Sequence, residues 1–158
     1  MIPSDHFVRF YNEAFKFLDE RDGLRGFYDE ISHHQDMHCL ALFKAKGLQG
    51  MYDYWNRIRI EEKCDMTMKL FPDRLVMIMN KCPSLSKAIN NDAGACPKYC
   101  NHCPGWVIPL LERAGYITEY NLVGMDDPRC VEVIRPKSSG RVSRVFMAPY
   151  DEDGNPIE

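Results

Sequence analysis

The spacing of hydrophobic residues in this 158-residue chain changes after Glu62, and this change most restricts the folds available to it. Before Glu62, apolar residues recur at intervals of three and four, which is typical of amphipathic helices. After it, Met66, Met68 and Leu70 alternate with polar residues, as in a strand with one buried face. Helices followed by strands predict an α+β domain.

The helical part divides at residues that interrupt or end helices. Asp22-Gly23 separates the first two helical segments, and Gly47 lies between the third and the fourth. A later helix is expected to end at Gly115. We expect helices over residues 7–18, 24–31, 36–47, 48–62 and 106–114, with a short one after Cys82.

Two hairpins are expected in the second part of the chain. Strands over residues 64–71 and 74–80 form the first, and strands over 116–123 and 130–135 form the second. We therefore expect N-terminal helices packed on an antiparallel sheet made of two hairpins. A cysteine-rich loop and a helix lie between these hairpins.

Length and composition fit a single domain. A chain of 158 residues with 45% hydrophobic residues is long enough to bury a full core. We expect residues 1–135 to form one α+β domain. Residues 136–158 are expected to form a polar C-terminal extension with an edge strand at 142–147.

Charge and cysteine content restrict the location and the partners. A net charge of −3 gives no general attraction for nucleic acid. No stretch approaches the roughly 18 apolar residues of a membrane span, and the N-terminus lacks a basic region followed by an apolar run. Seven cysteines, an odd number, fit reduced thiols better than a disulfide scaffold. We therefore expect a cytoplasmic protein with a small-molecule substrate or ligand, no nucleic acid and no membrane, and with a homo-oligomer or protein partner left open.

The segment from Cys96 to Trp106 concentrates reactive side chains. Cys96, Cys100 and Cys103 follow a C-x3-C-x2-C spacing, which radical S-adenosylmethionine enzymes use to hold an iron–sulfur cluster. Those enzymes carry the motif early in a large barrel, whereas only 55 residues follow Cys103. That length is too short for the remaining strand–helix units, so the spacing does not assign the chain to that class.

The same thiols can hold a metal without that fold. Three cysteines and one further side chain would complete a site for zinc or an iron–sulfur cluster. The candidate ligands are Cys96, Cys100 and Cys103, completed by Cys82, Cys130 or His102. The simplest alternative is a cysteine-rich loop whose buried thiols act as small hydrophobic side chains.

One thiol of this segment can instead act as a nucleophile. Lys98 adds positive charge that favours a thiolate, and Tyr99 can donate a hydrogen bond to Cys100. His102 stands two residues after Cys100 and can supply a base. Whether His102 reaches Cys100, Cys82 or neither thiol depends on geometry that the sequence leaves open.

Three short motifs resemble a known family over residues 48–135. The motifs are Met79-Asn80-Lys81-Cys82-Pro83, Tyr99-Cys100-Asn101-His102-Cys103 and Gly124-Met125-Asp126-Asp127-Pro128-Arg129-Cys130-Val131-Glu132-Val133-Ile134. Their order and spacing are similar to those of the L-2-amino-thiazoline-4-carboxylic acid hydrolase-like family. In layout such proteins resemble small-molecule-binding α+β domains of the vinyl-reductase type, some of which hold metal through cysteines.

The resemblance implies a reaction and a pocket. It implies ring opening or amide-like hydrolysis of a small substrate that contains sulfur and a carbon–nitrogen bond, with Cys82, Cys100 and Cys130 lining one pocket. In the family pattern an acidic residue often stands three positions after the middle cysteine, where this chain has Cys103. That difference removes a candidate general base and adds a metal ligand, which favours metal or redox chemistry.

Our leading hypothesis is a small cysteine-dependent, hydrolase-like enzyme whose pocket gathers Cys82, Cys100, His102 and Cys130. A thiolate at Cys100 or Cys82 attacks an electrophilic carbon, and His102 transfers the proton. Backbone N–H groups of residues 96–105 stabilise the developing negative charge.

The alternative hypothesis is a non-catalytic domain that senses a ligand or docks a partner protein. In it, Cys96, Cys100 and Cys103 bind zinc or an iron–sulfur cluster. Both hypotheses require sulfur atoms that are distant in the sequence to converge around a single cavity.

Overall fold

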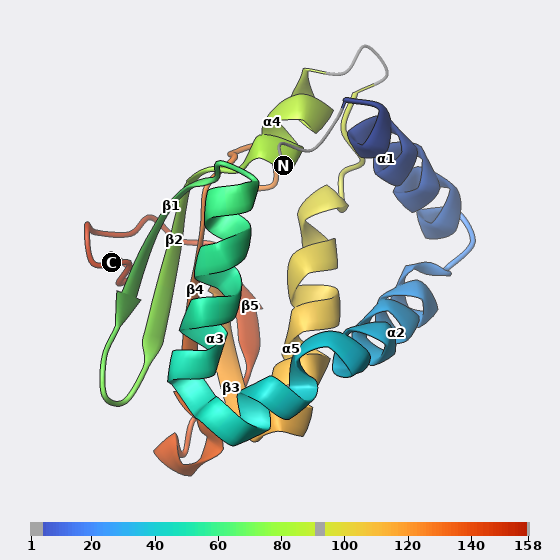
Figure 1. Cartoon of the computed structure of the whole chain (residues 1–158). Coiled ribbons are helices and arrows are strands. Elements are labelled where there is room, and N and C mark those ends of the chain that lie inside the picture. The colour runs from blue at the N-terminus through green and yellow to red at the C-terminus, as the bar shows by residue number, and fades with distance from the viewer. Residues whose placement is uncertain (1–4, 91–93, 158) are drawn as a thin grey trace.

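The computed structural model describes residues 5–90 and 94–157, and Figure 1 shows a group of helices packed against one sheet. The helical elements are α1 (Asp5–Asp19), α2 (Leu24–Gln35), the π-helical turn η1 (Asp36–Leu40), α3 (Ala41–Glu61), α4 (Pro83–Ile89), the 3-10 turn η2 (Tyr99–Asn101), α5 (His102–Ala114) and the 3-10 turn η3 (Lys137–Ser139). Gly47 has a φ of 57° and bends the chain inside α3, at the boundary that the sequence predicts. Within residues 5–90 and 94–157, no helix is long and apolar enough to cross a membrane.

In the described part of the chain, five strands form one sheet in the order β1-β2-β4-β3-β5. They are β1 (Asp65–Leu70), β2 (Leu75–Lys81), β3 (Tyr116–Asn121), β4 (Cys130–Pro136) and β5 (Arg144–Phe146). The two predicted hairpins pair with each other antiparallel through β2 and β4. β5 follows β4 after a short connection, reverses its direction and lies on the far side of β3. Because β4 is antiparallel to β3, β5 runs parallel to β3. The α+β class is confirmed, and the fifth strand makes the sheet mixed.

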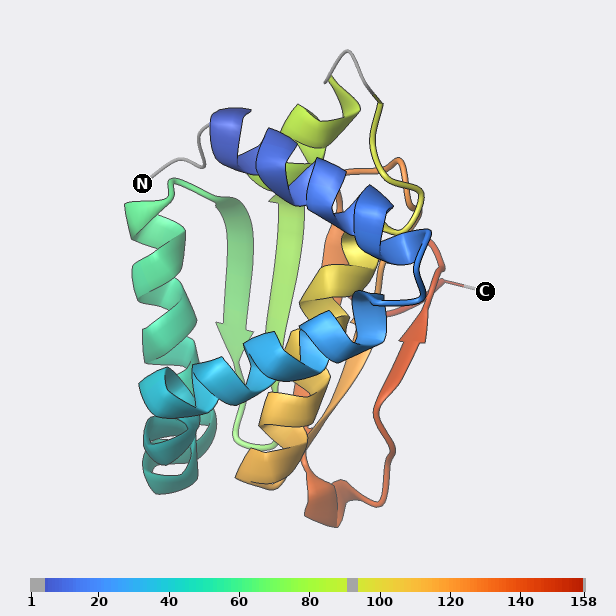
Figure 2. The ribbon, with the colours of Figure 1, turned by 90° about the vertical axis from the view of Figure 1, so that its right-hand side faces the viewer.

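The helices cover one face of the sheet, as the two views in Figures 1 and 2 show. Side chains of α3, α5 and the central strands form the main core, which consists of Cys39, Phe43, Met51, Leu75, Met77, Val107, Leu110, Leu111 and Ile134. A second core around Phe15 and Tyr99 joins α1, α2 and α4 to the start of α5. Burying one large apolar side chain stabilises a fold by about 1.5–3 kcal/mol, so these two cores fix the helices on the sheet.

The C-terminal segment covers part of the opposite face. Val76, Ile78 and Val131 point to that face and form a small cluster against which Tyr150 packs. Gly154, with a φ of 81°, lies so close that a Cβ atom there would be 2.9 Å from Val131 Cγ1. The segment predicted as a polar extension therefore contributes both β5 and a cover for the sheet.

The start of α5 differs from the prediction. The helix begins at His102 rather than at Trp106, so His102 and Cys103 belong to its first turn and not to a loop. Pro104 fits this position, because the first N–H groups of a helix have no partner within it. The expected cysteine-rich loop is therefore shorter, and the backbone of residues 102–105 is helical.

Candidate active site

Strand alternation places reactive side chains on the helix-covered face of the sheet. Cys130 and Glu132 of β4 point to the same face as the buried Ile134, since successive residues of a strand alternate between faces. In the sheet register, Glu132 lies between Tyr120 of β3 and Met77 of β2. The face that the helices cover thus carries a carboxyl, a phenol, a thiol and a thioether side by side.

Helices α3 and α5 enclose a cavity of about 390 Å³ against this face. Its walls combine aromatic rings and thioethers with a few polar groups, which is typical of small-molecule sites. The lining residues are Gln35, Tyr54, Trp55, Ile58, Arg59, Glu62, Cys64, Met66, Met77, Met79, Cys103, Trp106, Val107, Tyr120, Cys130 and Glu132. We call this space the main cavity, although a larger and more open hollow of about 680 Å³ lies between α2 and α5.

Glu132 is a buried carboxyl in the wall of the main cavity. It is only 5% exposed, and its Oε1 accepts a hydrogen bond of 3.1 Å from Thr118 Oγ1. Burial raises the pKa of Glu132 to about 8, although the Thr118 hydrogen bond opposes this shift. At neutral pH the carboxyl is therefore mostly protonated and can donate a proton.

Further polar groups face the same space. Gln35 Oε1 is buried and has no hydrogen-bond partner among the residues described. Arg59 brings a guanidinium group, and burial raises the pKa of Glu62. A buried acceptor without a partner is costly in a dry core, so these groups fit a cavity that receives a polar ligand or water.

His102 and Cys103 form a hydrogen-bonded pair at the start of α5. Nδ1 of His102 contacts the backbone carbonyl oxygen of Tyr99, and Nε2 lies 3.1 Å from Cys103 Sγ. Because a carbonyl oxygen can only accept, Nδ1 carries the proton and Nε2 accepts from the thiol. A thiol that donates to an imidazole is the arrangement of a nucleophile beside its base.

Aromatic rings bury the imidazole of this pair. The His102 ring stacks on Phe15 with 5.3 Å between centroids and lies 4.7 Å from the Trp106 ring. Burial lowers the pKa of His102 to about 4, so the ring is neutral at pH 7 and Nε2 is free to accept a hydrogen bond, while the same burial disfavours the protonated ring.

Cys103 is a protonated thiol in the resting state. Burial raises its pKa well above 9, and the neighbouring thiols Cys82, Cys130 and Cys100 act in the same direction. Its proton is therefore expected to leave during attack on a substrate. The N-terminus of α5 favours the negative charge that develops on the sulfur at that moment.

Three of the predicted cysteines lie beside this pair. Cys82, Cys100 and Cys130 line a second cavity of about 30 Å³ together with His102 and Cys103. Burial raises the pKa of all three thiols, that of Cys100 to about 12. Cys103 and Cys130 also line the main cavity and so stand between the two spaces. The structure thus brings together the four residues of the predicted catalytic set, and it adds Cys103.

The contacts of His102 differ from those that the catalytic hypothesis expects. Both ring nitrogens of His102 are engaged, one with Tyr99 and the other with Cys103, so the base expected to serve Cys100 or Cys82 contacts Cys103 instead. Cys82 has a structural role, because its Sγ accepts a hydrogen bond of 3.4 Å from Leu85 N and caps α4.

Cys96 does not line either of these two cavities. It is 2% exposed in the core around Phe15, and its backbone N–H donates a hydrogen bond of 2.7 Å to Asn12 Oδ1. Among the described residues, no three His, Cys, Asp or Glu side chains are grouped so as to hold a metal ion. The predicted ligand set of Cys96, Cys100 and Cys103 is therefore not assembled, because Asn12 of α1 holds the segment around Cys96 against the helices.

Sequence reasoning missed Glu132, Gln35 and Tyr120 as residues of the site. Glu132 could have been found, since a strand that turns Cys130 toward the thiols must turn the residue two positions later the same way. No pattern of this kind exists for Gln35, the last residue of α2. It reaches the cavity only because α2 continues through η1 into α3, whose side chains line the same cavity.

No model of a protein family matches this chain, and neither a curated protein nor a solved structure matches it. A thiol of α5 and a protonated carboxyl of β4 line one cavity of the size of a small molecule, and the imidazole that contacts this thiol lines the smaller cavity next to it.

Proposed function

We propose that this protein is a cysteine-dependent enzyme that hydrolyses a small molecule bound in the main cavity. The observation that carries the proposal is the distance of 3.1 Å between His102 Nε2 and Cys103 Sγ, at the wall of a cavity that also holds the protonated carboxyl of Glu132. A nucleophile in contact with a base, and an acid in the same cavity wall as the nucleophile, support nucleophilic catalysis better than a purely structural role.

In the proposed reaction, Cys103 Sγ attacks an electrophilic carbon of the substrate and its proton passes to His102 Nε2. The imidazolium then gives this proton to the leaving nitrogen or sulfur atom as the bond to carbon breaks. Glu132 donates a hydrogen bond to the substrate atom that gains negative charge. A water molecule then loses a proton to His102 and attacks the carbon, the bond between carbon and Cys103 breaks, and His102 returns the proton to the sulfur, which restores the thiol.

The cavity walls support a substrate class. The thioethers of Met66, Met77 and Met79 favour contact with a polarizable group such as sulfur. Gln35 and Glu132 offer an acceptor and a donor to a carbon–nitrogen group. These contacts agree with the small molecule, containing sulfur and a carbon–nitrogen bond, that the resemblance to the L-2-amino-thiazoline-4-carboxylic acid hydrolase-like family implies.

All seven cysteines are free thiols, which supports a reducing compartment such as the cytoplasm.

The test compares two cysteine variants with L-2-amino-thiazoline-4-carboxylic acid and small amides as probes. Ring opening by cleavage of the carbon–sulfur bond releases a thiol, which a colorimetric thiol reagent measures, and ammonia release measures amide hydrolysis. Cys103→Ala should lower turnover by about 100-fold or more, whereas Cys100→Ala should change it much less. Full turnover in Cys103→Ala, with the fold intact by circular dichroism, would rule out the proposed nucleophile.

A second candidate function is a metal-binding domain without catalysis. One observation favours it, namely that Cys82, Cys100, Cys103 and Cys130 line the same small cavity. Among the described residues these thiols are not grouped closely enough to hold an ion, so this candidate requires their side chains to move together on metal binding. Elemental analysis and an absorption spectrum of anaerobically purified protein distinguish the two candidates. Stoichiometric zinc or iron that disappears in Cys130→Ala would support the second candidate, and metal-free active protein would support the first.

A further inference from the structure

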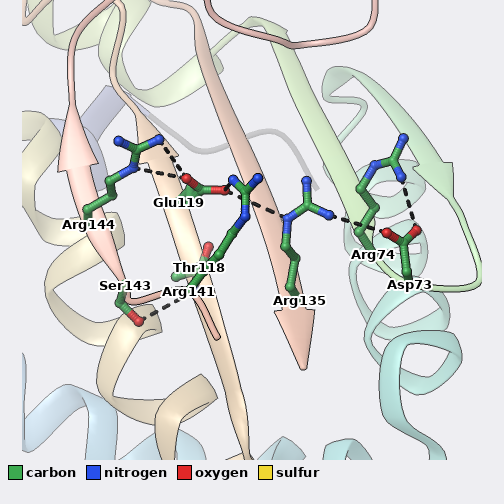
Figure 3. Close-up of polar contacts among 8 residues, drawn as sticks. All are labelled: Asp73, Arg74, Thr118, Glu119, Arg135, Arg141, Ser143 and Arg144. Atoms are coloured by element: carbon green, nitrogen blue, oxygen red, sulfur yellow. Dashed lines mark hydrogen bonds and ion pairs between the residues drawn. The ribbon is translucent and has the colours of Figure 1, made fainter. Parts of the chain in front are cut away.

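An arginine cluster, whose residues Figure 3 shows, lies on the face of the sheet that points away from the helices. Glu119 of β3 is its centre and is 8% exposed. Arg144 Nη2 lies 2.6 Å from Glu119 Oε1, and Arg141 Nη1 lies 3.0 Å from Glu119 Oε2. Arg135 Nε approaches the same Oε2 atom to 3.7 Å. Three guanidinium groups therefore converge on one carboxylate.

The fold brings these residues together from different parts of the chain. Glu119 points away from the helices because its neighbours Thr118 and Tyr120 point toward them. Arg144 is paired directly with Glu119 between the parallel strands β3 and β5. Arg135 comes from the end of β4, on the other side of Glu119.

The positive charge of the cluster is not balanced. A second carboxylate, Asp73, is 3.0 Å from Arg74 and 3.5 Å from Arg135. The set shown in Figure 3 then holds four arginines and two acids, an excess of two positive charges. Arg135 Nε is also buried and has no hydrogen-bond partner among the residues that the structure describes. Water solvates Arg141 and Arg144, whose side chains are 56% exposed, but a buried donor such as Arg135 Nε is expensive unless an acceptor accompanies it.

A cavity of about 250 Å³ adjoins this cluster. Arg135, Arg141 and Arg144 line it together with Glu119, and residues 154–156 of the C-terminal segment form another part of its wall. This volume is below the range of sites for larger organic ligands and suits a small anion. If the cluster served only to hold β5 on the sheet, one cationic side chain would be enough to pair with Glu119, whereas three arginines approach it.

We propose that this cavity binds a small dianion of the phosphate class, held by Arg135, Arg141 and Arg144. The planar guanidinium groups offer paired N–H donors, which match the oxygen atoms of a phosphate group. The excess of two positive charges equals the charge of the dianion. Glu119 keeps the arginines in place and limits the affinity by repulsion. This site lies on the far side of the sheet and is independent of the proposed hydrolysis.

Isothermal titration calorimetry with inorganic phosphate and with glycerol 3-phosphate tests the proposal, at an ionic strength held constant with chloride. We expect saturable binding of one anion per chain. Tighter binding of inorganic phosphate would indicate that the natural ligand is free phosphate, and tighter binding of glycerol 3-phosphate would indicate a phosphate ester. Arg141→Gln and Arg144→Gln should each weaken binding by about tenfold, since each removes charge-assisted hydrogen bonds. Arg57→Gln, which changes an exposed arginine on α3 that pairs with Glu61, is the matched control and should bind normally.

The Glu119→Gln variant distinguishes an anion-binding site from an ion-pair cluster that only holds β5 on the sheet. It removes the competing negative charge, so phosphate binding should become several-fold stronger while the variant itself becomes less stable. Circular dichroism and the melting temperature without phosphate verify that each variant is folded. The proposal fails if neither probe binds the wild-type protein, or if the Arg144→Gln and Arg57→Gln variants bind phosphate equally well.

Discussion

The imidazole of His102 folds back onto the thiol of the next residue, with 3.1 Å between Nε2 and Cys103 Sγ. Successive side chains on a helix point about 100° apart and do not normally meet. They meet here because the carbonyl of Tyr99, in the turn before α5, holds Nδ1, and because Phe15 of α1 covers the ring. The pair therefore depends on α1 and η2 as much as on its own helix.

His102 should titrate far below an ordinary histidine. Burial lowers its pKa from 6.5 to about 4, so the unfolded chain binds a proton between these pH values and the folded chain does not. Its contribution to stability is present above pH 6.5 and is lost as the pH falls toward 4, by up to about 1.4 kcal/mol per pH unit. Nitrogen-detected NMR should show the Nδ1–H form at pH 7 and a midpoint near 4. A midpoint near 6.5 would contradict the buried position.

Glu132 should make stability depend on pH in the sense opposite to His102, and Glu132→Gln should remove this dependence. Burial raises the pKa of Glu132 from 4.5 to about 8, so between these values the folded chain keeps a proton that the unfolded chain releases. The stability from Glu132 is full below pH 4.5 and is lost as the pH rises toward 8, again by up to about 1.4 kcal/mol per pH unit. His102 opposes this loss up to pH 6.5, so the decline should appear mainly above it.

Urea unfolding between pH 5 and 8 checks the Glu132 prediction. The difference in unfolding free energy between Glu132→Gln and the wild type should shift in favour of the variant as the pH rises. Glu20→Gln, at an exposed carboxylate beside Arg21, is the control and should follow the wild-type curve. A constant difference across this pH range would show that Glu132 ionises normally.

Gly105→Ala should destabilise the contact between α2 and α5. A Cβ atom at Gly105 would lie 2.5 Å from Cδ2 of Tyr28, whose ring is buried between Phe15 and Trp106. We expect a loss of about 1–3 kcal/mol in the free energy of unfolding, because the ring cannot move away without disturbing the core. Gly26→Ala on α2 meets no atom within 4 Å and should be neutral or stabilising by about 0.5 kcal/mol. Denaturant unfolding of both variants measures the contrast.

Cys82→Ala should cost about 0.5–1 kcal/mol through loss of the cap of α4. The Sγ atom accepts a hydrogen bond from Leu85 N, and Ser can provide the same acceptor through its hydroxyl group. Cys82→Ser should therefore retain most of the stability. Both variants should retain most of the catalytic activity as well, and an inactive but fully stable Cys82→Ser protein would point to Cys82 as a catalytic thiol.

Much of the local structure follows from the sequence because hydrophobic spacing and terminating residues act over a few positions. Gly47 and Gly115 mark the bend in α3 and the end of α5, and both have positive φ values. The alternation of Met66, Met68 and Leu70 correctly predicts β1. The first turn of α5 is missed, since Pro104 and Gly105 make the local sequence look like a loop. Contacts of this turn with Tyr28 and Phe15 outweigh that local preference.

The sequence alone determined that helices precede two hairpins, and that several thiols lie near one imidazole along the chain. Only the tertiary structure decided that this imidazole contacts Cys103, that Cys96 faces a different core, and that Glu132 is a buried acid. Distances between residues that are remote in sequence depend on how the helices pack against the sheet. The pKa of Glu132 and that of His102 depend on how much water this packing excludes, and no local pattern records either quantity.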